Sequence, residues 1–108
     1  SYNTSSDYRL KEDWQPMSGS IDRLKNLNPV NFAWKVDGSR VDGFLAHEVQ
    51  DIVPEAVSGE KDAVDSDGKP EYQGVDYGRI TPLLTAALKE AIEKIEMLEA
   101  RIAVLEAK

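Results

Sequence analysis

Two residues near the start of the chain, Ser6 and Lys11, carry side chains that could perform nucleophilic chemistry together. A serine hydroxyl is a poor nucleophile until a base removes its proton, and a neutral lysine amine can act as that base. A serine and a lysine separated by a few residues nevertheless form a weak motif. On spacing alone, the simpler interpretation is two polar residues near a chain terminus.

Few other residue types in the chain could support chemistry. The absence of cysteine excludes disulfides and thiolate metal sites, and a single histidine, His47, excludes a His-rich zinc site within one chain. We interpret His47 as a surface or hydrogen-bonded residue. Residues 65–68 (DSDG) resemble part of a calcium loop, but aligning Gly68 with that loop's glycine puts Ala63 and Gly74 where carboxylates are needed. We therefore expect a turn there, and neither a metal nor another cofactor.

Composition narrows the classes of partner. With 108 residues the chain forms one domain with a small core, which is better supported in an oligomer than alone. The 20 acidic and 13 basic residues give a net charge of −7, which would repel a nucleic-acid backbone. No apolar run is long enough to span a membrane, and no signal-peptide pattern opens the chain. We expect neither nucleic acid nor membrane as a partner.

Residues 81–108 form the longest regular pattern in the chain. Thr81 as N-cap and Pro82 in the first turn predict the start of a helix that would extend about 40 Å. Its apolar residues alternate in steps of four and three, which is a heptad seam flanked by charge. The members of this seam are Leu84, Leu88, Ala91, Ile95, Leu98, Ile102 and Leu105.

A helix of this length cannot bury such a seam within so small a domain, so we expect it to pair with copies of itself. The alternative is that the helix folds back on the globular part, as short amphipathic helices do. Ile at a with Leu at d favours two strands, but Leu88 at a and Ala91 at d blur that preference. The pattern alone leaves the oligomer number open.

The segments before this helix predict a small α+β domain. Residues 1–6 are polar and Ser-rich, as in a linker, and in residues 7–14 Leu10 and Trp14 could share a helical face. Residues 20–27 predict a short helix capped by Ser20. A hairpin of residues 30–36 and 41–45, turning at Asp37-Gly38, should follow.

The second half of this domain is predicted to continue with a helix and a strand. Residues 46–52 should form a short helix packed beneath the hairpin, residues 58–70 a polar loop, and residues 72–77 a last strand. Asp76 could cap a turn that leads into the long helix. The core candidates are Phe32, Trp34, Phe44 and Val49.

Several short motifs, in this order, resemble one family. SDYRLK (residues 6–11) resembles the opening S-D-x-R-x-K of the intramolecular chaperone domain at the C-terminus of phage endosialidases and related tail fibres and spikes, the peptidase S74 family. GFLAHEVQ and VPEAV (residues 43–50 and 53–57) resemble that family's central block. VDY and the stretch from PLL to ALKE (residues 75–77 and 82–90) resemble its closing signature before a terminal coiled coil.

The resemblance implies both an assembly role and a self-processing activity. Such domains form homotrimers that hold an upstream fibre or spike segment of the same chain in register, and then cut themselves off with a serine and a lysine. The resemblance identifies Ser6 as the nucleophile, Lys11 as the base and the Ser6–Asp7 bond as the bond that is cut. Attack on the Ser5–Ser6 carbonyl, an N-to-O shift, is chemically easier but would cut one bond earlier.

The resemblance also implies a domain division and a place of action. Residues 1–6 would be the end of the upstream segment, residues 7–80 the globular chaperone domain and residues 81–108 the trimeric coiled coil. The domain would act in the cytoplasm of the infected bacterial host during virion assembly and be absent from the mature particle. Two alternatives stay open: a trimerisation module that does not cleave, and a receptor-binding tip of a fibre.

Overall fold

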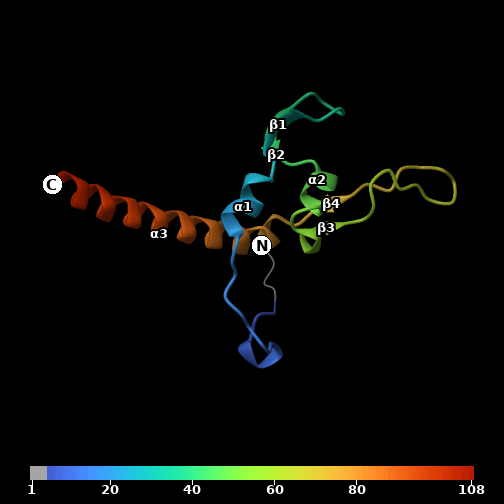
Figure 1. Cartoon of the computed structure of the whole chain (residues 1–108). Coiled ribbons are helices and arrows are strands. Elements are labelled where there is room, and N and C mark those ends of the chain that lie inside the picture. Colours follow the sequence, from blue (N-terminus) through green and yellow to red (C-terminus); the bar gives the residue numbers. More distant parts are fainter. Residues whose placement is uncertain (1–4) are drawn as a thin grey trace.

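The computed structural model describes residues 5–108 and shows a small α+β body from which one long helix projects (Figure 1). This confirms the predicted fold class. The first four residues of the predicted 1–6 linker lie outside the described residues. The elements in chain order are η1 (Tyr8–Leu10), α1 (Ser20–Lys25), β1 (Val30–Ala33), β2 (Arg40–Gly43), α2 (Ala46–Gln50), η2 (Pro54–Ala56), β3 (Val57–Ser58), β4 (Gly74–Val75), η3 (Tyr77–Arg79) and α3 (Thr81–Glu106).

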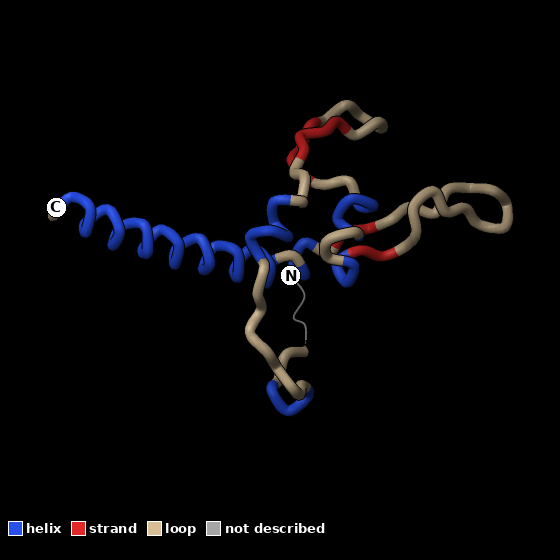
Figure 2. Tube along the Cα trace, in the orientation of Figure 1, coloured by secondary structure: helices blue, strands red, loops and turns tan. Residues whose placement is uncertain are grey.

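The molecule is strongly elongated, with principal extents of 72 × 41 × 24 Å. Figure 2 shows short helices gathered around the start of α3 and three segments extending away from them. These segments are the N-terminal arm (residues 5–19), the β1–β2 hairpin, and the loop between β3 and β4. No helix within residues 5–108 is long and apolar enough to cross a membrane.

The core lies where α2 and the turns around it meet the first turns of α3. Val49 of α2 is fully buried, and Ile80 and Leu83 bring the start of α3 into the same cluster. The remaining buried members of this cluster are Leu27, Val53 and Ala56. Burying each large aliphatic side chain contributes about 1.5–3 kcal/mol. The start of α3 is therefore part of the body as well as the root of the projecting helix.

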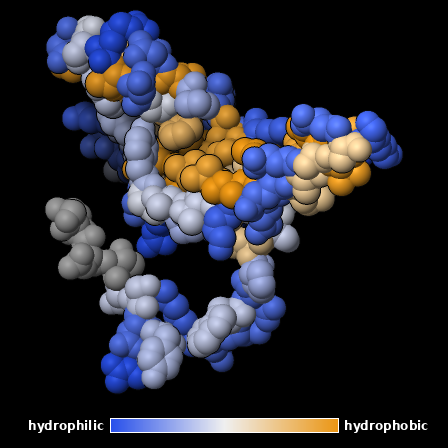
Figure 3. Space-filling view, turned by 90° about the vertical axis from the view of Figure 1, so that its left-hand side faces the viewer, coloured by the Kyte–Doolittle hydropathy of each residue, from blue (hydrophilic) through white to orange (hydrophobic). Residues whose placement is uncertain are grey.

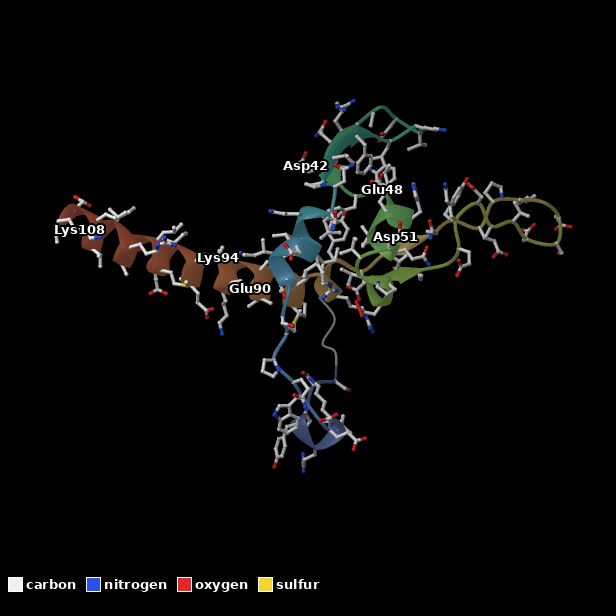
Figure 4. The ribbon with its side chains drawn as sticks, viewed as in Figure 1. Asp42, Glu48, Asp51, Glu90, Lys94 and Lys108 are labelled. Atoms are coloured by element: carbon white, nitrogen blue, oxygen red, sulfur yellow. The ribbon has the colours of Figure 1, made fainter. Side chains whose placement is uncertain are left out.

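A carboxylate from α3 caps the first turn of α1. The Glu90 carboxylate accepts hydrogen bonds from the Ser20 N–H (2.8 Å) and the Ile21 N–H (3.5 Å), which lie some seventy positions earlier in the chain (Figure 4). These bonds satisfy backbone donors that a helix start leaves free. The Ser20 N–H is the main cause that lowers the pKa of Glu90 below its ordinary value of 4.5.

The predicted N-caps of α1 and α3, Ser20 and Thr81, are wrong. Gly19, in the left-handed region at φ 65°, occupies the N-cap position of α1, and Ser20 is instead the first helical residue, fully buried. At α3 the N-cap is Ile80, which has no side-chain cap bond, and Thr81 is already helical. In both cases tertiary contacts hold the start of the helix, because the Ser20 N–H binds the Glu90 carboxylate and Ile80 packs in the core cluster.

The predicted hairpin is present but shorter than expected. β1 and β2 pair antiparallel with Val30 opposite Gly43 and Ala33 opposite Arg40. The predicted strand over residues 72–77 is reduced to β4, which pairs with β3, a strand the sequence did not predict. Asp76 caps η3 as expected, by accepting a hydrogen bond from the Gly78 N–H.

Trp34 is not a core residue. It lies just beyond β1, 53% exposed, with its ring set edge-on against Phe32 at a centroid distance of 4.9 Å. Of the four core candidates only Val49 is fully buried, while Phe44 packs partly buried against the core. The hairpin leaves the body too early for its alternation to reach the core, so removing the Trp34 ring should cost far less than a buried tryptophan would.

The last residue of β2, Gly43, lies so close to two aromatic side chains that a larger residue would not fit there. A Cβ atom on Gly43 would lie 2.6 Å from the Tyr77 hydroxyl and 2.9 Å from the Phe32 ring. Phe44, the next residue, packs edge-on against the Tyr77 ring at 5.7 Å. Tyr77 thereby joins the hairpin to η3, the turn that leads into α3.

We predict that Gly43→Ala destabilises the fold by about 1–3 kcal/mol, the usual cost of overpacking, because Tyr77 or Phe32 must move. Thermal or denaturant unfolding at fixed chain concentration measures the change. Adding Tyr77→Phe to this variant should recover part of the loss, since it removes the closest atom. Unchanged stability of Gly43→Ala would show that Tyr77 does not sit over this strand.

We predict that the stability difference between the wild type and Glu90→Gln depends on pH. The folded-state pKa of Glu90 is lowered, so its charged form stabilises the fold above pH 4.5, and this contribution is lost as pH falls through the folded pKa. Melting curves at pH 7 and pH 3 should therefore show a gap that closes in acid. Glu93→Gln, an exposed neighbour on α3, is the control and should show no such gap.

Candidate active site

A single capped turn organises the start of the N-terminal arm. The Asp7 side chain accepts a hydrogen bond from the Arg9 N–H, and the Leu10 and Lys11 N–H groups donate to the Asp7 and Tyr8 carbonyls. These bonds define η1. The helical turn ends at Leu10, because Lys11 already has an extended backbone. Leu10 and Trp14 do not share a helical face, and both are exposed.

Arg9 clamps the residue that caps this turn. Its Nε lies 3.0 Å from Asp7 Oδ1 and its Nη2 lies 2.9 Å from Asp7 Oδ2, a two-point contact between guanidinium and carboxylate. The side-chain bonds from Arg9 lower the pKa of Asp7, and its backbone N–H adds to this. Within the motif SDYRLK, the aspartate and the arginine therefore hold the turn between the serine and the lysine.

The turn brings the two predicted catalytic side chains into contact. Lys11 Nζ lies 2.6 Å from Ser6 Oγ, close enough for direct proton transfer between them. Both residues are solvent-exposed. The residues on either side of the expected cut, Ser6 and Asp7, lie at the entrance of the same turn.

One side of Ser6 faces a cavity that the sequence did not predict. The cavity has a volume of about 550 Å³ and is lined by residues of both the arm and the body. Two arginines from different elements line it: Arg23 of α1 and Arg79 of η3. The other lining residues are Met17, Val53, Glu55, Gly78, Pro82 and Leu83. No local pattern could have found this set, because its members come from four separate parts of the chain.

The heptad seam of α3 is uncovered in the single chain. Its six large members are 47–63% exposed, and Ala91 is half-buried. The body instead covers a neighbouring stripe that includes Leu83 and Ala87. Figure 3, viewed from the side on which α3 ends, shows exposed apolar side chains at the centre of the molecule and on the parts that extend from it. One face of α3 therefore packs against the body of its own chain, and the face that carries the seam is exposed in the single chain.

Two other features singled out in the sequence, the turn at residues 65–68 and His47, can also be located in the structure. In residues 5–108 no cluster of three His, Cys, Asp or Glu side chains could hold an ion. The Asp65 carboxylate accepts hydrogen bonds from the Asp67 and Lys69 N–H groups, which makes residues 65–68 the expected turn. His47 is half-buried on α2 and does not line the cavity beside Ser6.

Comparison with known proteins identifies the family. Residues 6–58 match the family model Peptidase S74, described as the chaperone of endosialidase. The match begins at Ser6 and includes the capped turn, the hairpin and α2. The chain belongs to the Peptidase S74 family.

Relatives of this S74 chain are long tail fibre proteins of phages. It is 30% identical over 102 residues to long tail fiber protein Gp37 of Enterobacteria phage K3, which covers 90% of this chain and 8% of that protein. Gp37 of Enterobacteria phage T2 is also 30% identical, with 7% of its length covered. Gp37 of Salmonella phage S16 is 27% identical over 108 residues, covering 93% of this chain and 14% of that protein. The chain thus spans only a small part of each relative.

Under the self-cleavage that the family resemblance implies, the contact between Ser6 and Lys11 predicts the behaviour of three variants. Ser6→Ala should abolish cleavage because it removes the nucleophile, and Lys11→Ala should slow it by orders of magnitude because it removes the base. Lys11→Arg should be nearly as damaging, since arginine stays protonated. Gel analysis and mass spectrometry of chains expressed with upstream sequence give the readout.

A matched control for these variants is Ser18→Ala, which removes another exposed serine of the same arm and should cleave like the wild type. Full-rate cleavage by Ser6→Ala would disprove the dyad.

Proposed function

We propose that this S74 domain is an intramolecular chaperone that trimerises, holds an upstream phage tail-fibre or tailspike segment of the same chain in register, and then releases itself by autoproteolysis. The observation that carries the proposal is the uncovered seam of α3, which a single chain cannot bury. The family match and the Gp37 relatives support a role in fibre assembly. The short contact between Ser6 and Lys11 supports the self-release.

Association through α3 would remove the seam from water. Leu88, Ile95 and Ile102 at a are each more than half exposed in the single chain, and a parallel coiled coil would bury them. Because the body covers the adjoining stripe of α3, the seam near its start lies free beside the body. The trimeric number comes from the family resemblance, and the partners are two further copies of the same chain.

Such a trimer would solve a folding problem. Intertwined fibre segments fold slowly and tend to aggregate, because their contacts are non-local and lie between chains. Joining three C-termini raises the effective concentration of the upstream segments and sets their register. Cutting the template away afterwards makes unfolding hard to reverse and leaves the fibre kinetically trapped. We place this action in the cytoplasm of the infected host, before the mature particle forms.

Self-cleavage would use Ser6 and Lys11 in two steps. Ser6 Oγ attacks a carbonyl carbon while its proton passes to neutral Lys11 Nζ, and the carbonyl electron pair moves onto oxygen. When this oxyanion collapses, the C–N bond breaks and the departing nitrogen takes the proton from Lys11. The product is an ester, which water hydrolyses to a carboxylate and the regenerated hydroxyl.

Two carbonyl groups are candidates for this attack. Attack on the carbonyl of Ser6 itself releases the Asp7 amine through a strained four-membered ring and gives the expected Ser6–Asp7 cut. Attack on the Ser5 carbonyl is an N-to-O shift and frees the Ser6 amine. The N-terminal sequence of the released fragment distinguishes them, because it begins with Asp7 in the first case and with Ser6 in the second.

We predict that replacing both Ile95 and Leu98 by Asp yields monomers that fold poorly, since each associated chain would bury two unpaired charges. Sedimentation of the wild type and the variant measures the oligomer. Glu93→Asp with Glu96→Asp, on the exposed charged face of α3, is the control and should stay trimeric. An unchanged oligomer in the seam variant would contradict association through α3, whereas a native dimer would change only the number.

A time course on the chain with its natural upstream segment tests the coupling of folding and release. We expect cleavage to follow trimerisation and upstream folding, and to slow when the upstream segment is scrambled. Equal rates with both segments would refute the coupling while leaving the dyad intact. A stable trimer that never cleaves would identify a pure trimerisation module, and a domain retained on purified particles would indicate a receptor-binding tip.

A further inference from the structure

One of the two arginines that line the cavity beside Ser6 forms no ion pair within residues 5–108. Arg79 pairs with Asp76 at 3.3 Å and is exposed, so its charge is both compensated and solvated. Arg23 is half-buried and forms no ion pair among residues 5–108. Its Nη2 donates to the Ile52 carbonyl at 3.0 Å, which fixes the guanidinium at the wall of the cavity. Four of its five N–H donors take no part in that bond.

The reacting oxygen of the proposed cleavage would form beside this cavity. Whichever carbonyl is attacked, that of Ser5 or that of Ser6, the tetrahedral intermediate carries its negative oxygen within a few bonds of Ser6 Oγ. Ser6 and Arg23 line the same cavity. A fixed cation in a partly enclosed site stabilises such an oxyanion more than a mobile one in water, because it is less screened and already oriented.

We propose that Arg23 stabilises the oxyanion formed when Ser6 attacks, and so is a further residue of the self-cleavage site. This inference rests on the proposed autoproteolysis. Arg23 provides the charge in the transition state, while Lys11 moves the proton and Ser6 forms the new bond. The carboxylate of Glu55 also lines the cavity, but it is exposed to solvent and its opposing charge is therefore screened.

The test compares self-cleavage rates of the chain expressed with its natural upstream segment. Arg23→Gln removes the charge but keeps an amide that can donate to the Ile52 carbonyl, and we expect cleavage to slow about a hundredfold, as when one oxyanion donor is lost. Arg23→Lys keeps the charge and should cleave faster than Arg23→Gln. Lys25→Gln, an exposed cation of the same helix outside the cavity, should cleave like the wild type.

Oligomer state and melting temperature of each variant separate a role in chemistry from a role in folding. Loss of cleavage in Arg23→Gln with an unchanged trimer and melting temperature supports the proposal. Cleavage by Arg23→Gln within about threefold of the wild-type rate would overturn it. Equal losses of cleavage in Arg23→Gln and Arg23→Lys, accompanied by a lowered melting temperature in both, would also overturn it. If the wild type itself does not cleave, or Ser6→Ala still does, the proposed autoproteolysis fails first, and the assignment of Arg23 fails with it.

Discussion

The packing of the first turns of α3 into the body is the contact on which the rest of the structure depends. Ile80 and Leu83 complete the core around Val49, and Glu90 holds the start of α1 two turns further along the same helix. One rigid helix therefore carries the core, the cap of α1 and the free seam. The direction in which the seam projects is consequently fixed relative to the body, because the first turns of α3 pack against α1 and into the core cluster.

This arrangement gives α3 two faces with different surroundings. Leu83 and Ala87 face the chain's own body, whereas Leu84 and Leu88, one position further on, face outward. Adjacent residues on a helix differ by about 100° in direction, so both faces can coexist over the same turns. Association of copies would thus bring three bodies together around the seam without displacing the core of any of them.

The candidate site depends on a smaller constraint, the capped turn η1. Asp7 caps it and Arg9 clamps Asp7, so the chain reverses within six residues and places Lys11 against Ser6. The contact between Ser6 and Lys11 is therefore set by local bonds alone, while the cavity beside Ser6 is built by α1, η2, η3 and α3. A site with this construction would have its nucleophile present early and its charged surroundings only after the body has folded.

Much of the fold was predictable from sequence, because it is encoded in local periodicity. The heptad seam, the β1–β2 hairpin, α2 and the Asp76 cap all follow from spacing of a few residues, and the motif that joins Ser6 to Lys11 is equally local. The sequence could not show that the hairpin stands away from the core. Alternation indicates which side chains share a face of a strand, but not whether that face packs against another element. For this reason the alternating pattern predicts Trp34 in the core, whereas its side chain is exposed.

By itself the sequence determined the positions of α1, α2, α3 and the β1–β2 hairpin, which residues form the seam and which pair could perform the chemistry. Only the tertiary structure decided where the helices begin, that Glu90 caps α1 from across the chain, that Gly43 lies beneath Tyr77, and that Arg23 shares a cavity with Ser6. The physical reason is the range of the interactions. Propensity and hydrogen bonding between near neighbours act within a turn or two, whereas caps, close packing and cavities join residues brought together only when the core forms.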